Sequence, residues 1–251
     1  MKSKKEKVSV IVPIFNEAGV IKKILSEIKS RLKKSGFTYE IIVVNDGSTD
    51  TSGLILEKER GIRVISNSCN QGYGFSIKRG VGVAKFKIIA IIDCDGSYQV
   101  KDLLRLIKAY KPWQMVIGAR VKSRGELSLS RRIIKNILNS YVSYLTGKDV
   151  LDLNSGLRVF SKKQFLEFLP LFPKGFSLTS TLTLSFYHHG YLVRYLPIDY
   201  LPRVGSSKMR LLRDPLKIFF TVFKISFYYW PLKAIFPFVL VWGLSLIGFL
   251  I

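Results

Sequence analysis

The stretch that decides the fold is IIAIIDCDGS, residues 88–97. Its first five residues are apolar and mostly β-branched, which is typical of a strand buried on both faces of a parallel sheet. Asp93 and Asp95 follow directly, so we expect them at the carboxyl end of that strand, where open α/β sheets bind ligands. Two carboxylates this close repel each other unless a proton or a cation such as Mg²⁺ or Mn²⁺ lies between them. A solvated turn is the alternative for so short a motif.

Strand-like and helix-like segments alternate around this stretch, which predicts an α/β fold with a Rossmann-like, mostly parallel sheet flanked by helices. Strands are expected at 8–14, 40–45, 63–66, 88–92, 115–117 and 193–198, and helices at 17–34, 51–60, 74–84 and 100–110. We expect a catalytic domain at 1–213, amphipathic juxtamembrane helices at 214–233 and a transmembrane segment at 234–251.

The composition is strongly basic. Forty Lys and Arg against seventeen Asp and Glu give a formal net charge of +23 over 251 residues. Such a charge attracts nucleic acid, an anionic lipid surface or a phosphorylated substrate. Two cysteines without metal-ligand spacing exclude a disulfide scaffold and a zinc protein, and we expect the adjacent His188 and His189 to pack rather than bind a ligand. The polar amino terminus predicts no cleaved signal peptide.

The last eighteen residues, 234–251, carry no charge. As a helix they would reach roughly 27 Å, close to a hydrocarbon core of roughly 30 Å, so we expect a membrane-spanning segment interrupted by the chain end. A buried core helix is the alternative. In residues 214–233, phenylalanines recur at helical spacing among lysines, which predicts an amphipathic helix on an anionic membrane. The positive-inside rule then places the catalytic region on the cytoplasmic side.

Polar side chains also follow the first two expected strands. Glu17 follows the first strand, and Asn45 and Asp46 lie at the end of the second, each before an expected helix. Acidic groups at strand ends, next to helix amino termini, suit a nucleotide whose ribose and base need hydrogen-bond acceptors. Helix capping is the alternative for Asp46 and for Asp50.

These motifs form an ordered set with NQGYG at 70–74, GAR at 118–120, DLNSGLR at 152–158 and RVGSSK at 203–208. In this order they resemble the family 2 glycosyltransferases with a GT-A fold, and most closely the polyprenyl-phosphate group that includes dolichol-phosphate mannose synthase. The resemblance covers residues 7–213. It implies inverting transfer of a hexose from a GDP- or UDP-linked donor to a dolichyl or undecaprenyl phosphate at the cytoplasmic membrane face.

The resemblance also implies roles for individual residues. Asp93 and Asp95 would bind Mg²⁺ or Mn²⁺, with Asp95 the more direct ligand. Arg120 and Arg131 would face the acceptor phosphate and, with the two aspartates, complete the catalytic set. The residues expected to bind the nucleotide sugar are Pro13, Phe15, Glu17, Val44, Asp46, Asp93, Cys94, Asp95, Arg203 and Lys208.

Three features depart from the family pattern. Asn45 stands where the family often has an Asp, which leaves the base open. Ser97 stands where the mannose synthases have a Gln that assists the metal, so water would take a larger part in coordination. The loop at 203–208 is one residue shorter, which leaves the reach of Lys208 open.

A lipid phosphate is already anionic at neutral pH, so its attack requires positioning and charge screening rather than a strong base. We therefore expect no essential His or Cys.

One alternative function is that of a glycosyltransferase with a saccharide acceptor, but the chain has no Q-x-x-R-W signature. The other is a non-catalytic, basic membrane-surface or nucleic-acid binding protein, which would not need acidic groups at strand ends. We expect nucleotide sugar, polyprenyl phosphate and anionic lipid as partners, and not nucleic acid. The sequence does not determine which sugar is transferred or the oligomeric state, and a homo-oligomer is compatible with it.

Overall fold

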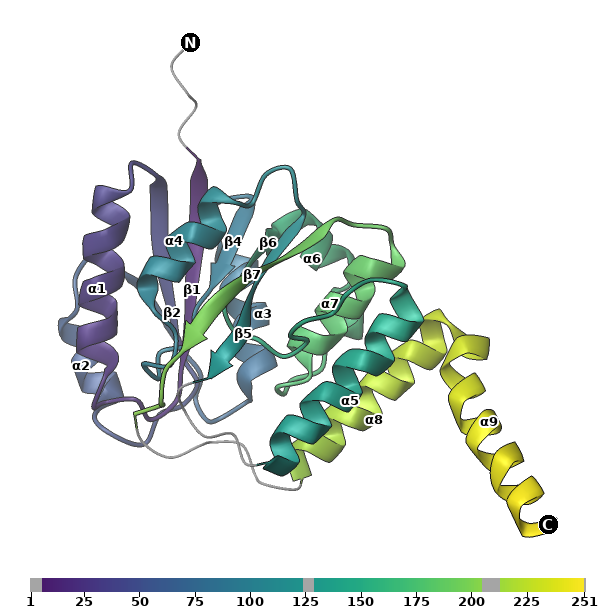
Figure 1. Cartoon of the computed structure of the whole chain (residues 1–251). Helices are drawn as coiled ribbons and strands as arrows, with labels where there is room; N and C mark the ends of the chain where they lie inside the picture. The colour runs from purple at the N-terminus through teal and green to yellow at the C-terminus, as the bar shows by residue number, and fades with distance from the viewer. Residues whose placement is uncertain (1–5, 124–128, 205–212, 251) are drawn as a thin grey trace.

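The computed structural model describes residues 6–123, 129–204 and 213–250. Within these ranges the strands form one seven-stranded sheet in the order β3-β2-β1-β4-β6-β5-β7, with helices on both faces (Figure 1). The strands are β1 (Lys7–Ile14), β2 (Thr38–Asn45), β3 (Arg63–Ser66), β4 (Ile88–Ile91), β5 (Met115–Ser123), β6 (Arg158–Ser161) and β7 (Val193–Tyr200). Neighbouring strands are parallel except that β6 runs antiparallel to β4 and β5.

The sheet separates two apolar cores because successive side chains of a strand point to opposite faces. On one face, Val10 and Val12 pack with α1 (Ile21–Lys34) and α4 (Val100–Lys108). On the other face, Ile11 packs with α3 (Tyr73–Val83) and α7 (Leu178–His188). The remaining elements are α2 (Ser52–Lys58), α5 (Leu129–Thr146), α6 (Lys162–Glu167), a short 3₁₀ helix (Leu169–Leu171), α8 (Arg213–Tyr229) and α9 (Pro231–Leu250).

The predicted alternation of strands and helices is confirmed, with two differences. The first helix begins at Ile21 rather than residue 17, because Asn16 has a positive φ of 55° and the chain turns before the helix starts. Strand β6 was not predicted; it contains only four residues and begins with the buried Arg158. A charged residue at the start of so short a strand hides its apolar character.

Helix α8 packs against the body of the protein along one side. Its buried residues Ile218, Val222 and Ile225 share a third apolar cluster with residues of α5 and α7. Figure 1 shows α5 and α8 lying side by side. Leu216 and Phe220 on the same helix remain 56% and 65% exposed, so α8 also presents apolar side chains outside this cluster.

Helix α9 extends away from the rest of the chain (Figure 1), and the side chains of Phe236 and Trp242 are 56% and 65% exposed. Within the described ranges, no helix is long and apolar enough to cross a membrane. The transmembrane segment predicted at 234–251 is therefore not found there. Lys233 lies in the first turn of α9, so the uncharged part, 234–250, gives about 26 Å of helix against a hydrocarbon core of roughly 30 Å.

The core packing of α1 generates a stability prediction. Leu25→Ala removes a fully buried side chain between α1 and the sheet, and should lower the free energy of unfolding by about 2–5 kcal/mol through lost burial and the cavity left behind. Leu54→Ala, at a site 59% exposed, is the matched control and should change it by less than about 0.5 kcal/mol. Urea unfolding of both variants measures the difference, and equal effects would contradict this packing.

Candidate active site

A pocket of about 540 Å³ opens at the carboxyl ends of β1, β2 and β4. It lies where parallel strands of an α/β sheet end and helices begin, as expected for a ligand site. Eight of the predicted donor-site residues line it: Pro13, Phe15, Glu17, Asp46, Asp93, Cys94, Asp95 and Arg203. The sequence analysis did not assign Tyr73, Phe176, Ser177 or Lys217, which line it too.

Asp93 and Asp95 lie together at the end of β4. Asp95 is buried, and its Oδ1 accepts hydrogen bonds from the Ser97 amide at 3.0 Å and from the Ser97 hydroxyl. Asp93 packs so closely on Gly156 that a Cβ at that glycine would come within 2.2 Å of Asp93 Oδ2. Asp93 Oδ1 and the Tyr73 hydroxyl are both buried, and neither has a partner at full hydrogen-bonding geometry among the described residues, but the two groups interact electrostatically. The Asp93 carboxylate is therefore incompletely satisfied by the protein.

Electrostatics at Asp93 favour a proton or a cation. Burial, and next the charge of Asp95, raise the pKa of Asp93 to about 7. The carboxyl therefore gains a proton near neutral pH unless a positive ligand holds it ionised. Burial also raises the pKa of the Cys94 thiol well above its ordinary value, so the side chain between the two aspartates is a neutral part of the wall.

Arg203 connects two of the acidic groups. Its guanidinium lies 2.6 Å from Glu17 Oε1 and 3.6 Å from Asp95 Oδ2. These carboxylates come from segments after β1 and after β4, so the arginine joins two strand ends across the pocket. In this arrangement the Arg203 charge is already shared between protein groups.

Asp46 holds the edge of the pocket. Its carboxylate accepts hydrogen bonds from Asn67 Nδ2 at 2.5 Å, from the Gln71 amide at 3.0 Å and from the Gly72 amide at 2.9 Å. These contacts fix the loop that leads into α3. The helix begins at Tyr73, whose ring stacks on Phe176 with centroids 5.6 Å apart.

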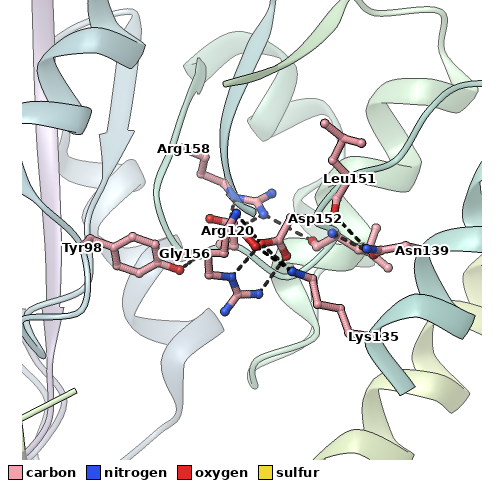
Figure 2. A network of polar contacts seen from close by, with 10 residues as sticks. Tyr98, Arg120, Lys135, Asn139, Leu151, Asp152, Gly156 and Arg158 are labelled. Atoms are coloured by element: carbon pink, nitrogen blue, oxygen red, sulfur yellow. Dashed lines mark hydrogen bonds and ion pairs between the residues drawn. The ribbon is translucent and has the colours of Figure 1, made fainter. Parts of the chain in front are cut away.

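Arg120 is held by a buried carboxylate (Figure 2). Its Nε and Nη2 donate to Asp152 at 2.7 and 2.8 Å, its amide donates at 3.0 Å, and Lys135 Nζ lies 3.4 Å from the same carboxylate. Burial opposes ionisation of Asp152, but the charge and hydrogen bonds of Arg120 prevail and lower its pKa to about 2. Arg120 is thus committed to Asp152 and is not among the described residues that line the pocket.

Arg158 fixes the loop between Asp152 and β6. Its fully buried guanidinium donates to the Ser155 carbonyl at 2.6 and 3.0 Å and to the Thr179 carbonyl at 3.1 Å, and makes no ion pair within the described residues. The Gly156 amide of this loop donates to the Tyr98 hydroxyl at 2.8 Å (Figure 2). The loop that packs on Asp93 is therefore held from both sides.

Three further predicted site residues are not part of the described pocket lining. The side chain of Val44 is fully buried in the core against α3 and does not line the pocket. Arg131 belongs to α5, but its side chain is not among those that the structure describes. Lys208 lies outside the described residues.

Residues 9–168 match the family described as glycosyl transferase family 2, so the chain belongs to this family and is a glycosyltransferase. Uncharacterized protein MJ1222 of Methanocaldococcus jannaschii is 32% identical over 77% of this chain and 81% of its own length. Human dolichyl-phosphate beta-glucosyltransferase is 30% identical over 63% of this chain and 56% of its own.

An undecaprenyl-phosphate 4-deoxy-4-formamido-L-arabinose transferase of Photorhabdus laumondii is 30% identical over 62% of this chain, which spans about half of that relative's length (50%). Among solved structures, glucosyl-3-phosphoglycerate synthase of Mycobacterium tuberculosis, in complex with Mn²⁺, UDP and phosphoglyceric acid, matches with a TM-score of 0.67. The match is 18% identical and covers 88% of this chain and 78% of that one. These findings establish the GT-A fold and relatives that include polyprenyl-phosphate sugar transferases.

The buried Asp152 generates a prediction with a defined pH dependence. Asp152→Asn leaves Arg120 without its counter-charge and should lower the free energy of unfolding by about 3 kcal/mol or more. The folded carboxyl has a pKa of about 2, below the roughly 3.9 of an unfolded aspartate, so its stabilisation is present above pH 4 and is lost as pH falls towards 2.

Unfolding of the variant should therefore depend less on pH between 4 and 2 than unfolding of the wild type. The exposed Asp149→Asn, three residues away, is the control and should keep the wild-type profile. Urea unfolding at a series of pH values checks both, and identical acid profiles for all three proteins would contradict the assignment.

Proposed function

We propose that this chain transfers a hexose from a nucleotide diphosphate sugar to a polyprenyl phosphate, with inversion at the anomeric carbon. The observation that carries the proposal is the pocket in which Glu17, Asp93, Asp95 and Arg203 meet at the strand ends. Its support comes from relatives named for undecaprenyl-phosphate and dolichyl-phosphate acceptors. In the reaction, an acceptor phosphate oxygen bonds to the anomeric carbon while the bond to the diphosphate oxygen breaks.

The residues fit a divalent cation that is shared with the donor. Within the described residues no group of three or more His, Cys, Asp and Glu could hold a metal by itself. Asp93 and Asp95 supply two carboxylates, and Asp93 Oδ1 has no partner at full hydrogen-bonding geometry among the described residues. Mg²⁺ and Mn²⁺ are commonly bound through one or two carboxylates plus substrate phosphates. When bound, the cation would offset the charge that develops on the departing diphosphate.

The protein groups have separate tasks in this proposal. Ser97 orients the Asp95 carboxylate through two hydrogen bonds. Arg203 can exchange its contact with Glu17 for the diphosphate, because a guanidinium binds phosphate and carboxylate oxygens alike. We assign no general base, since the acceptor phosphate is ionised before it attacks.

We also propose that the reaction occurs on the cytoplasmic face of a membrane, which α8 and α9 would contact through their exposed apolar residues. The division into a catalytic domain at 1–213 and membrane-associated helices beyond it belongs to this proposal, as do an acceptor role for Arg131 and a donor role for Lys208. The basic composition supports contact with anionic lipid.

The direct test is transfer by the purified chain from a panel of GDP- and UDP-hexoses to undecaprenyl and dolichyl phosphate, with product detected by mass spectrometry. We expect Asp95→Asn to reduce transfer at least about 100-fold, and a chelator to abolish it until Mn²⁺ or Mg²⁺ is restored. Asp149→Asn, exposed and remote from the pocket lining, should stay near wild type. Full transfer by Asp95→Asn would exclude the assigned role, and no transfer from any donor would exclude the function.

The contacts of Arg203 predict a measurable effect on metal affinity. Without nucleotide, the guanidinium occupies the space beside Asp95 that a cation would share, so Arg203→Ala should bind Mn²⁺ more tightly while transferring sugar more slowly. Electron paramagnetic resonance of free Mn²⁺ gives the affinity without any turnover. Arg194→Ala, an exposed arginine outside the pocket, is the control. Weaker Mn²⁺ binding by Arg203→Ala would contradict competition.

A further inference from the structure

Lys217 lines the pocket but has no role in the donor site or the metal site proposed above. It lies in the second turn of α8, whereas the carboxylates of the lining follow β1, β2 and β4. Its side chain is exposed, and it makes no ion pair with any residue that the structure describes. Arg203, the other basic residue of the described lining, is paired with Glu17.

Of the two cations first expected to bind the acceptor, Arg120 and Arg131, only the side chain of Arg120 is described, and it is already engaged. Arg120 donates two side-chain hydrogen bonds to Asp152, and Lys135 lies 3.4 Å from the same carboxylate. A phosphate that reached Arg120 would have to compete with a fully buried counter-charge. Lys217 faces no such competition from the described residues.

The pocket itself is acidic. Glu17, Asp46, Asp93 and Asp95 all line it, so an acceptor phosphate entering it is repelled unless a cation accompanies it. Lysine serves as a point charge for phosphate without needing a fixed two-point geometry. A lysine contributed by α8 can therefore hold one phosphate while the donor diphosphate lies beside the carboxylates that follow the strands.

The neighbours of Lys217 on the helix indicate what the phosphate is attached to. Leu216, Phe220, Phe223 and Phe227 recur at intervals of four, three and four residues, so they lie along one side of α8. We call these four residues the α8 apolar strip. Phe220 is three residues from Lys217, which makes the two side chains neighbours on the helix surface. The ring of Phe223 lies 5.3 Å from that of Phe238, so the strip continues onto α9.

We propose that Lys217 binds the phosphate of the acceptor, and that Leu216 and Phe220 receive the first isoprene units of its chain. This inference rests on the proposed function and names the residue that selects the acceptor. In the transfer, the phosphate held by Lys217 contributes the attacking oxygen, the anomeric carbon leaves the diphosphate, and a nucleoside diphosphate departs. No proton needs to move, because the attacking phosphate is ionised.

The test compares two lysines on one helix. Lys224 lies seven residues beyond Lys217, on the same side and about 10 Å farther along, and it is exposed but does not line the pocket. Lys217→Ala should raise the KM for undecaprenyl phosphate about tenfold or more, the usual cost of a lost contact to a charged group. Its affinity for the nucleotide donor, measured by calorimetry, should stay within twofold. Lys224→Ala should change neither quantity more than twofold, and Lys217→Arg should restore most of the acceptor affinity.

A second arm separates lipid from a free phosphate. Phe220→Ser should raise the KM for undecaprenyl phosphate and for citronellyl phosphate several-fold, because both carry the first isoprene units, but leave the rate of transfer to methyl phosphate, which has no isoprene chain, near wild type. An equal effect on methyl phosphate, or preferred transfer to water-soluble phosphoglycerate, would overturn the assignment of the strip to a lipid chain.

The outcomes distinguish this inference from the function on which it rests. If the wild type transfers no sugar to any polyprenyl phosphate, the proposed function fails. If the wild type transfers sugar and Lys217→Ala keeps the wild-type KM for the acceptor, or loses donor affinity equally, the inference fails while the function stands. Circular dichroism of each variant confirms that α8 remains folded.

Discussion

The arrangement of this site depends on the burial of one carboxylate, that of Asp152. It has no exposed surface and receives three hydrogen bonds from Arg120 as well as the charge of Lys135. Desolvation offsets most of what such an ion pair gains, so its contribution to net stability is small, whereas breaking one half of it is costly. Its main effect is therefore to fix the relative positions of the segments that it joins. It joins β5, α5 and the loop before β6, three segments distant in sequence.

The loop that follows Asp152 also contacts Asp93 in the pocket. Arg158 engages the carbonyl of Ser155, and Tyr98 accepts the amide hydrogen bond of Gly156. Gly156 then presses on Asp93, with no room for a side chain between them. This close packing is part of the burial that raises the pKa of Asp93 to about 7. A loop held by buried charges thus contributes to the burial of a carboxylate whose raised pKa favours binding of a proton or a cation.

Sequence patterns predicted one half of the site better than the other. Glu17, Asp46 and Asp95 follow parallel strands, and parallel strands end at the same edge of a sheet, so local patterns were sufficient to bring them together. The partner of Arg120 was not predictable in this way, because Asp152 is 32 residues away and meets it only through the antiparallel β6. Lys217 was missed for a similar reason, since the return of α8 against α5 and α7 is decided by tertiary packing. For the α9 segment, apolar composition predicted a membrane span, whereas no helix of the described residues is long and apolar enough to cross a membrane.

Charge is distributed unevenly between the pocket and the rest of the protein. The formal charge of the chain is +23, yet the described lining of the pocket has four carboxylates and two cations. The excess of positive charge therefore lies outside the pocket, where it cannot hold a donor but can raise the local concentration of an anionic partner. An anionic molecule drawn to the surface meets net negative charge once it reaches the strand ends. A ligand that brings its own cation, or one whose phosphate stays beside Lys217 of α8, avoids this repulsion. This difference supports the proposal that the donor and the acceptor phosphate occupy different parts of the pocket.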